Sequence, residues 1–329
     1  MRVLLFDTAV GSTNVGDDII MDAIRQVIDE LFPEAIKLSA ATHDYLDSHG
    51  VALAKRSDLK FLCGSNILSS HVFKESTWLL RPYQAFRLRD VVAFGVGWKD
   101  YQEKATFVTK FTYNRIFSSR LLHSVRDEYS KKMLESIGIR SLNTGCPTMW
   151  RLTPERCASI PVLKAPAVVF ATTFYRPNVE VDREIYLALK SKYEKIYFWP
   201  QQYEDIEYFQ SWSNGDDEII PPNLIHYNYV LDNLNVDFVG SRLHGGIRAM
   251  QRGRRSLILS VDNRAREIAS DTHLPVLDRS EKERIVDWIS SPTPVSLKLP
   301  VNEIQTWKDQ FRSLNADAGN SSYFRITAR

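Results

Sequence analysis

The sequence predicts an α/β protein built from two doubly wound, Rossmann-like domains that face a central cleft. Three observations lead to this prediction. The chain has 329 residues, more than a single hydrophobic core of about 250–300 residues accommodates. Short apolar runs alternate with helical patterns, which is the rhythm of parallel strands joined by crossover helices. A proline-rich stretch interrupts this alternation near the middle of the chain, after which it restarts.

In the first half, the predicted strands are short apolar runs bounded by polar or turn-forming residues. They cover residues 3–6, 35–38, 59–63, 91–96 and 121–125. After the first strand and a small polar loop, apolar residues from Ile19 to Leu31 recur at helical spacing, and this helix ends before Pro33. Further helices are expected over 78–86, 106–117 and 128–137. Five strands with intervening helices make one doubly wound domain.

A second domain is predicted after the stretch 151–166, whose prolines Pro154, Pro161 and Pro166 mark the connection between domains. Strands are predicted at 167–171, 195–199, 236–240 and 256–260, and helices at 184–193, 203–212, 243–251 and 265–270. From residue 301 to 314, the apolar spacing predicts a closing amphipathic helix. We therefore expect an N-terminal domain over 1–155, a C-terminal domain over 156–300, and a closing helix and tail over 301–329.

The composition excludes several classes of protein. The 42 Lys and Arg residues nearly balance the 40 Asp and Glu residues, so the chain lacks the basic excess of a protein that binds nucleic acid through its phosphates. Cys63, Cys146 and Cys157 are too few and too widely spaced for a disulfide framework or a cysteine-rich zinc site. No apolar run is long enough for a signal-peptide core, or for a membrane span of about 18 residues. We expect a cytoplasmic protein without a bound metal.

The first loop that could carry chemistry follows the first predicted strand and contains Asn14, Asp17 and Asp18. Gly11 and Gly16 are spaced like the outer glycines of a nucleotide-binding phosphate loop, but the Lys and Ser/Thr of that loop are missing. Asn14 or Asp17 could simply cap the following helix. Alternatively, Asn14 and Asp17 line the cleft and hydrogen-bond the hydroxyl groups of a sugar-like ligand.

A second loop, at the end of predicted strand 121–125, contains Arg126 and Asp127. Arg126 could present its fork of donors to a carboxylate or a phosphate. Asp127 could instead be only the cap of the next helix, with Arg126 as its ion-pair partner. The sequence leaves both interpretations open.

The third loop is the most informative, because it follows predicted strand 236–240 and opens a helix with Arg242, His244, Gly245 and Gly246. The free amides and the dipole of a helix N-terminus favour an anion, and the glycines would let a ligand approach the backbone closely. His244 and Arg248 are four residues apart and share a helix face that is expected to look into the cleft. Histidine titrates near neutral pH and can transfer a proton, although a lone histidine is more often structural.

Taken in order, these loops resemble those of the polysaccharide pyruvyl transferases, from about residue 1 to residue 290. The residues that carry the resemblance are Thr13-Asn14-Val15-Gly16-Asp17, Val125-Arg126-Asp127-Glu128 with Ser130, and Gly240-Ser241-Arg242-Leu243-His244-Gly245. The resemblance implies a glycosyltransferase B-type fold and transfer of a pyruvyl group from phosphoenolpyruvate to two sugar hydroxyls, which gives a cyclic ketal and phosphate. The chain departs from the family at Cys63-Gly64-Ser65-Asn66, where many members have a run of glycines, and at Thr144-Gly145-Cys146-Pro147-Thr148, where they often have an acidic residue and proline.

The resemblance matches Arg242 and His244 to the family's Arg-Leu-His motif and Arg126 to its central Arg-Asp motif. For the reaction that it implies, charge and position then suggest roles for individual residues. His244 would be the general acid, and Asp17 the base that accepts a proton from the acceptor hydroxyl. The residues expected to bind the donor are Arg242, Gly245, Gly246, Arg248, Arg126 and Arg264. The residues expected to bind the acceptor are Asn14, Asp18, Trp98 and Tyr101, the last two by stacking on a sugar ring.

The expected partners are phosphoenolpyruvate as donor substrate and a lipid-linked or nucleotide-linked sugar as acceptor, with no cofactor and no nucleic acid. The protein would act in the synthesis of a cell-envelope polysaccharide or exopolysaccharide, in the cytoplasm or at the inner face of the membrane. Two alternatives stay open. One is a glycosyltransferase that uses a nucleotide sugar in the same cleft, and the other is a non-catalytic protein that binds a sugar or an anion, because a fold alone does not establish chemistry.

Overall fold

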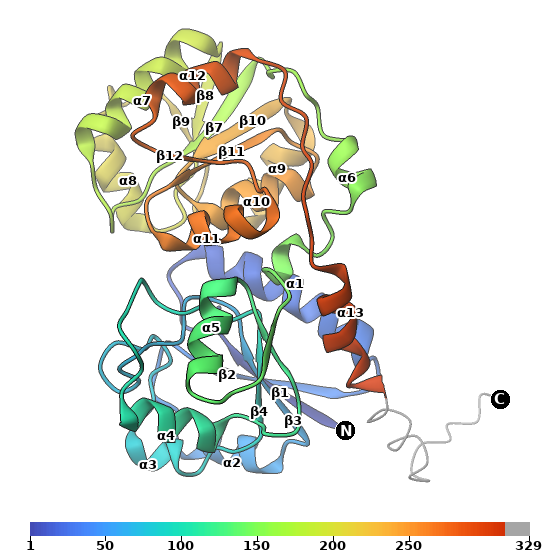
Figure 1. Ribbon diagram of the computed structural model, residues 1–329. Helices are drawn as coiled ribbons and strands as arrows, with labels where there is room; N and C mark the ends of the chain where they lie inside the picture. The colour runs from blue at the N-terminus through green and yellow to red at the C-terminus, as the bar shows by residue number, and fades with distance from the viewer. Residues whose placement is uncertain (313–329) are drawn as a thin grey trace, which may run out of the picture.

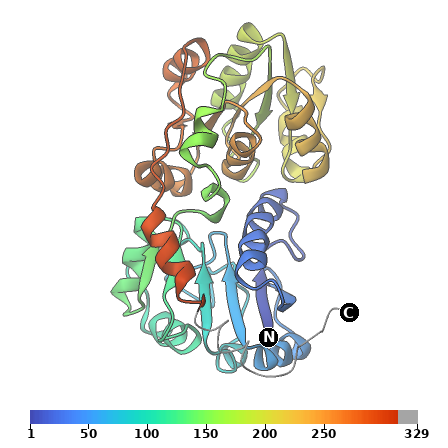
Figure 2. The same cartoon turned by 90° about the vertical axis from the view of Figure 1, so that its right-hand side faces the viewer.

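The computed structural model describes residues 1–312 and contains two α/β domains, one above the other (Figures 1 and 2). The first domain has a four-stranded parallel sheet in the order β2-β1-β3-β4. These strands are β1 (Arg2–Asp7), β2 (Ile36–Ala41), β3 (Leu59–Cys63) and β4 (Val91–Phe94). A parallel pair, β5 (His123–Val125) and β6 (Ser141–Asn143), continues the sheet beyond β4 through the isolated bridge between Val96 and Val125.

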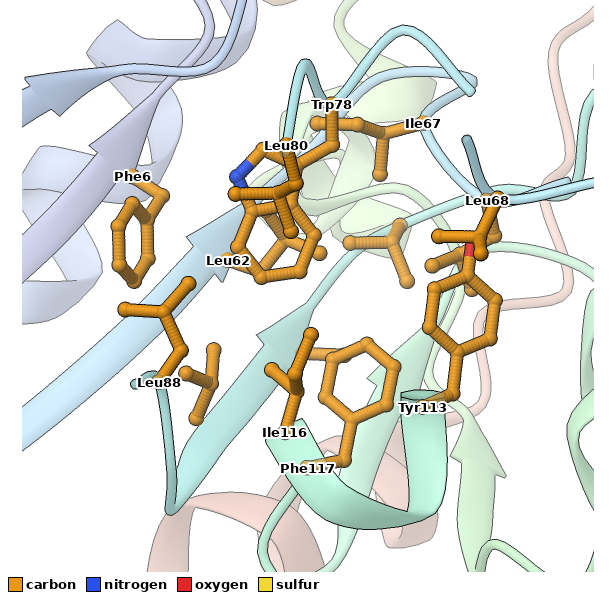
Figure 3. Close-up of a cluster of buried hydrophobic side chains, with 14 of the residues drawn as sticks. Phe6, Leu62, Ile67, Leu68, Trp78, Leu80, Leu88, Tyr113, Ile116 and Phe117 are labelled. Atoms are coloured by element: carbon orange, nitrogen blue, oxygen red, sulfur yellow. The ribbon is translucent and has the colours of Figure 1, made fainter. Parts of the chain in front are cut away.

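Helices cover both faces of this sheet. One face is covered by α1 (Val15–Leu31), whose buried Ile20, Ile24 and Ile28 pack in a cluster with strand residues of β1 and β3. The other face is covered by α2 (Ser48–Arg56), α3 (Pro82–Ala85), α4 (Phe107–Ile116) and α5 (Glu128–Ser136). Figure 3 shows the core on this second face, where Phe6 and Leu62 of the sheet lie among Trp78, Tyr113 and Phe117.

The second domain has a six-stranded parallel sheet in the order β12-β11-β10-β7-β8-β9. Its strands are β7 (Ala167–Ala171), β8 (Lys195–Phe198), β9 (Glu218–Ile219), β10 (Val236–Gly240), β11 (Ser256–Ser260) and β12 (Val276–Asp278). One face is covered by α7 (Val179–Lys192), α8 (Tyr203–Gln210) and α12 (Lys282–Ser290), and the other by α9 (Leu224–Asn233), α10 (Leu243–Gln251) and α11 (Asn263–Thr272). Two doubly wound sheets of parallel strands confirm the predicted fold class.

The chain passes between the domains twice. The first passage contains a 3₁₀ turn (Pro147–Met149) and α6 (Pro154–Ala158), and its buried Leu152, Cys157 and Ile160 pack against α10 of the second domain. The predicted connection over 151–166 is therefore a packed segment. The predicted border between residues 155 and 156 falls inside α6 and stays a prediction.

The second passage leads to α13 (Val301–Asp309), which returns to the first domain (Figure 2). Trp307 is fully buried there, with its ring 4.3 Å from that of Phe94 and 6.2 Å from that of Phe61. A closing helix is thus present where one was predicted, although it ends at Asp309. Residues 313–329 of the predicted tail lie outside the described residues.

Several elements differ from the sequence-based expectations. The predicted helix over 78–86 is shorter in the structure, where α3 covers only Pro82–Ala85. The segment before Pro82 is not helical, and its Trp78 and Leu80 pack into the core. The elements that the patterns missed are α2, α6, α9, α12, β6, β9 and β12. The missed strands have only two or three residues, too few for a pattern to show. No helix among residues 1–312 combines the length and the apolar character needed to cross a bilayer.

Candidate functional site

The carboxyl ends of the strands of both sheets meet where the N-termini of α1 and α10 approach each other. Gln201, which follows β8, lies between these two helix ends. Its carbonyl accepts a hydrogen bond from the amide of Val15 at 3.0 Å. A Cβ atom added to Gly16 would lie 2.8 Å from Oε1 of Gln201, and one added to Gly245 would lie 3.1 Å from its Nε2. Elements of both domains therefore build one site, as expected at the carboxyl ends of parallel strands.

His244 lies in the first turn of α10 and is almost fully buried at this junction. Its Nε2 lies 3.8 Å from Sγ of Cys146, which belongs to the first passage between the domains. Burial lowers the pKa of His244 to about 3, and the positive charges of Arg126 and Arg264 act in the same direction. His244 is therefore uncharged at neutral pH in the free protein.

Arg126 follows β5 and is one of the largest fully buried side chains. Its Nε donates to Oδ2 of Asp127 at 3.2 Å, and its Nη2 donates to Oδ1 of Asn66 at 2.7 Å. Asp127 also caps α5 by accepting from the amide of Ser130 at 2.7 Å. The capping and ion-pair interpretation of this loop is confirmed. It is compatible with a ligand, because Nη1 of Arg126 donates to no other group among residues 1–312.

Arg264 brings a second, partly buried cation to the site, from α11 of the second domain. Its Nε donates to Oδ2 of Asp262 at 2.9 Å, and its Nη2 reaches the hydroxyl of Tyr175. Burial alone would raise the pKa of Asp262, but Arg264 and, more weakly, Arg126 hold it below its usual value. Arg126 of the first domain and Arg264 of the second domain therefore both act electrostatically on His244.

Asp17 is the carboxylate of α1 that turns toward this cluster. It accepts a hydrogen bond from the Ser12 hydroxyl at 2.6 Å and lies 3.8 Å from Nε2 of His43. Burial raises its pKa, against the opposing effects of Ser12, His43 and Arg264. Asp17 is thus a carboxylate whose affinity for a proton is increased, as a general base requires.

The other two candidates of this loop have different positions. Asn14 is the N-cap of α1, since its Oδ1 accepts from the amide of Gly16 at 3.1 Å, so the capping interpretation is confirmed for this residue. Asp18 is exposed, and burial of part of its surface raises its pKa while Arg25 opposes this. Its role toward an acceptor stays a prediction.

Buried polar side chains without a hydrogen-bond partner recur at these strand ends within residues 1–312. They are Thr8 after β1, Thr42 after β2, Thr172 and Thr173 after β7, Ser241 after β10, Asn263 at the start of α11, and Nε2 of Gln201. Buried polar groups are normally satisfied by protein, water or ligand. These side chains have hydrogen-bonding capacity that the described residues do not use, although each polar atom is buried in this conformation.

Two arginines predicted to bind the donor are engaged elsewhere. Arg242 is buried, and its guanidinium contacts both carboxylate oxygens of Asp205, while its Nε donates to the carbonyl of Thr172 at 3.2 Å. Arg248 pairs with Asp22 of α1 at 2.9 Å and therefore joins the two domains. Their charges are balanced by carboxylates in this conformation, and contact of these two side chains with the donor stays a prediction.

The glycines of α10 also have another explanation than the predicted one. A Cβ atom on Gly246 would lie 2.4 Å from Cγ1 of Ile258 in β11, and one on Gly245 would lie 2.9 Å from the ring of Trp199. Both glycines therefore allow close packing of α10 on its sheet. Close approach of a ligand is not needed to explain them.

The two aromatic candidates for the acceptor side differ from each other. Trp98 is fully buried, and its Nε1 donates to Gln102 at 3.0 Å, so the prediction that it stacks on a sugar is wrong. Tyr101 is 59% exposed and donates its hydroxyl hydrogen bond to Glu267 of α11 at 2.5 Å. Burial and the Glu267 carboxylate raise the pKa of Tyr101 to about 12. Its contact with an acceptor stays a prediction.

Sequence reasoning missed four members of the site, namely Asn66, Cys146, Tyr175 and Asp262. A signal was available for each, because each follows a strand at its carboxyl end: β3, β6, β7 and β11. The sequence alone does not show which of these loops turn toward each other, because that depends on how the domains pack.

Comparisons with known proteins address the fold and the family. The family model described as polysaccharide pyruvyl transferase matches residues 14–263. Among solved structures, the UDP-GlcNAc 2-epimerase of Methanocaldococcus jannaschii in complex with UDP-GlcNAc and UDP is similar with a TM-score of 0.54 and 11% identity, over 96% of this chain and 100% of that chain. The S. aureus MnaA structure with UDP is similar with a TM-score of 0.51 and 10% identity, over 89% and 91%. No curated protein matches the chain significantly. These similarities show a glycosyltransferase B-type arrangement of two Rossmann-like domains.

Proposed function

Because the chain belongs to the polysaccharide pyruvyl transferase family, and is therefore a transferase, we propose that it moves a pyruvyl group from phosphoenolpyruvate to two hydroxyls of a sugar. The products are a cyclic ketal and phosphate. The single observation that supports this donor best is that two arginines, the buried Arg126 and the partly buried Arg264, both lie within electrostatic reach of His244. The pair combines positive charge from both domains around one group that can exchange a proton.

The donor carries a phosphate and a carboxylate, and so it needs concentrated positive charge. The chain as a whole has a net charge of only +2, which makes local placement decisive. Arg126 and Arg264 each use Nε and Nη2 for protein partners. Their remaining guanidinium edges suit a planar, charged group such as a carboxylate or a phosphate. The amide groups at the N-terminus of α10 add favourable dipoles.

His244 would act only once the donor is bound. Negative charge between the two arginines offsets their effect on His244, so its pKa rises and the imidazole takes up a proton. His244 then gives this proton to the methylene carbon, which becomes a methyl group, while the first sugar hydroxyl bonds to the neighbouring carbon. Phosphate leaves with the electron pair of its carbon–oxygen bond, and the second hydroxyl bonds to the same carbon. The new methyl hydrogen thus comes from His244, the proton of the first hydroxyl passes to Asp17 and from there to solvent, and the proton of the second hydroxyl leaves with phosphate. The proton that His244 takes up from solvent balances the one that Asp17 returns.

Asp17 would accept the proton from the attacking hydroxyl. Its carboxylate is buried, its pKa is raised by that burial, and it lies within electrostatic reach of Arg264 on the donor side. The buried hydroxyls of Thr8 and Thr42, which have no hydrogen-bond partner among the described residues, are the candidates for contact with the acceptor sugar at the ends of β1 and β2. We assign the first domain to the acceptor and the second domain, with Arg264 and α10, to the donor.

A second candidate function is transfer of a sugar from a nucleotide donor in the same cleft. This candidate is supported by the similar fold of two proteins whose structures contain UDP or UDP-GlcNAc. The two functions differ in their leaving group. Phosphate would be released in the first reaction and a nucleoside diphosphate in the second.

The experiment that tests the proposal measures phosphate release from phosphoenolpyruvate with a panel of lipid-linked and nucleotide-linked sugars. We expect release only when both donor and acceptor are present. His244→Gln should lower turnover by about 10²–10⁴-fold, the usual contribution of a positioned proton-transfer group. His49→Gln, at an exposed histidine of α2, is the matched control and should leave turnover unchanged. Release of a nucleoside diphosphate instead of phosphate would contradict the proposal.

A further inference from the structure

The outer face of α4 has an apolar surface that the fold does not explain. Tyr113, Ile116 and the following Phe117 point into the core of the first domain (Figure 3). On the opposite side, Phe107 is 81% exposed and Phe111 is 50% exposed. A surface helix normally keeps polar residues on its solvent side. Two exposed phenylalanines one turn apart therefore indicate an external contact.

Neighbouring segments extend this surface. Tyr83 of α3 and Phe86 just after it are exposed, and the Phe86 ring lies 6.1 Å from that of Phe111. A groove of about 510 Å³ runs along the outer side of α4. Its lining includes Arg89, Phe107, Lys110, Phe111 and Arg115. We call segments 81–90 and 104–120 together the α3–α4 surface.

The charge of the α3–α4 surface is strongly positive. Its basic residues are Arg81, Arg87, Arg89, Lys104, Lys110, Arg115 and Arg120, against the single acidic residue Asp90. This gives a net charge of +6 on a chain whose total is +2, so the remainder of the chain is negative. Within the described part of the chain, none of these seven cations belongs to an ion pair with a carboxylate.

We propose that the α3–α4 surface binds the anionic surface of a phospholipid membrane. A membrane surface has charged phosphates in its headgroup region and an apolar boundary with the acyl chains beneath. The unpaired cations of the α3–α4 surface would bind the phosphates, and its exposed aromatic rings would enter the apolar boundary. Figure 1 shows α3 and α4 at the end of the first domain that points away from the second domain. Docking there leaves the junction between the two domains uncovered. The proposal does not depend on the transfer reaction, so its failure would leave the proposed function standing.

The test is co-sedimentation of the full chain with vesicles. We expect binding to vesicles of phosphatidylcholine mixed with phosphatidylglycerol, little binding to phosphatidylcholine alone, and weakening of binding as salt is raised. Phe107→Glu with Phe111→Glu removes the apolar part, and Arg89→Glu with Lys110→Glu reverses two charges. Each double variant should weaken partitioning by more than about tenfold.

The matched control carries the same type of change on the second domain. Ile225 and Tyr229 of α9 are 79% and 64% exposed, and Ile225→Glu with Tyr229→Glu should bind vesicles like the unmodified chain. All the substituted side chains are exposed, so equal thermal unfolding will verify that each variant folds. Equal binding to neutral and anionic vesicles, or full binding by both α3–α4 double variants, would overturn the proposal. So would a dimer in solution that Phe107→Glu with Phe111→Glu dissociates, because the surface would then bind a second copy of the chain.

Discussion

Replacing Gly97 by alanine should displace the Arg126 guanidinium and lower activity, although Arg126 itself is unchanged. A Cβ atom on Gly97 would lie 2.3 Å from both Cζ and Nε of Arg126, far inside van der Waals contact. The guanidinium has little room to move, because it is fully buried and hydrogen-bonded to Asp127 and Asn66. The backbone at Gly97 has no positive φ, so the effect is purely steric.

The magnitude follows from the size of this overlap. Overpacking a buried site costs about 1–3 kcal/mol of unfolding free energy, and displacement of a positioning group by an ångström costs about 10²-fold in rate. Unfolding in urea measures the first quantity, and phosphate release per folded enzyme measures the second. We expect the free energy of unfolding and the turnover per folded enzyme both to be lower in Gly97→Ala.

The control for Gly97→Ala is Gly50→Ala in α2, whose added Cβ would lie 2.5 Å from Cδ1 of Leu46. It introduces a similar overlap with a side chain, but outside the site. We expect a loss of stability without a loss of turnover per folded molecule. Unchanged turnover in Gly97→Ala, or an equal loss of turnover in both variants, would refute the reasoning about Arg126.

Three further predictions concern charge. Cys146→Asp places a carboxylate beside His244, so it should raise the pKa of that histidine and move the basic limb of the pH–rate profile, where the general acid loses its proton, to higher pH, whereas Cys146→Ser should not. Asp22→Asn removes the interdomain ion pair of Arg248 and should lower the unfolding free energy by about 1–3 kcal/mol in a urea titration, since it leaves a largely buried cation without its partner. Burial lowers the pKa of His123 to about 4, below its unfolded value of about 6.5, so the unfolded chain takes up a proton first and stability falls as pH drops from about 6.5 to about 4. This loss should approach about 3 kcal/mol and be smaller in His123→Asn; a pH-independent unfolding midpoint over that range would contradict it.

The sequence predicted the buried strands well, because their physics is local. Strands 59–63, 236–240 and 256–260 are short and mostly apolar segments that end in Cys, Gly and Ser, and the structure has the same limits. The edge strands β9 and β12 were missed, since few of their residues are buried and they have no clear alternation. Their position depends on pairing with a neighbour, which one sequence does not reveal.

The site was predictable only as a set of loops. The sequence indicated that Arg126 and His244 follow strands, and the structure brings them within electrostatic reach of each other. It did not indicate that Arg248 pairs with Asp22 of the other domain, because a helix buried on nearly all sides gives no signal for which face meets which neighbour. The burial of Trp98 was hidden for a similar reason, as nothing in its irregular loop distinguishes a core ring from a surface ring.

The central claim is that Arg126 and Arg264 bind phosphoenolpyruvate and thereby allow His244 to take up a proton. Calorimetric titration of the protein with phosphoenolpyruvate, in buffers that differ in ionisation enthalpy, measures both binding and proton uptake. We expect binding with proton uptake by the unmodified protein, reduced uptake in His244→Gln, and loss of binding in Arg126→Gln. Absence of phosphoenolpyruvate binding, together with binding of a nucleotide sugar, would contradict it.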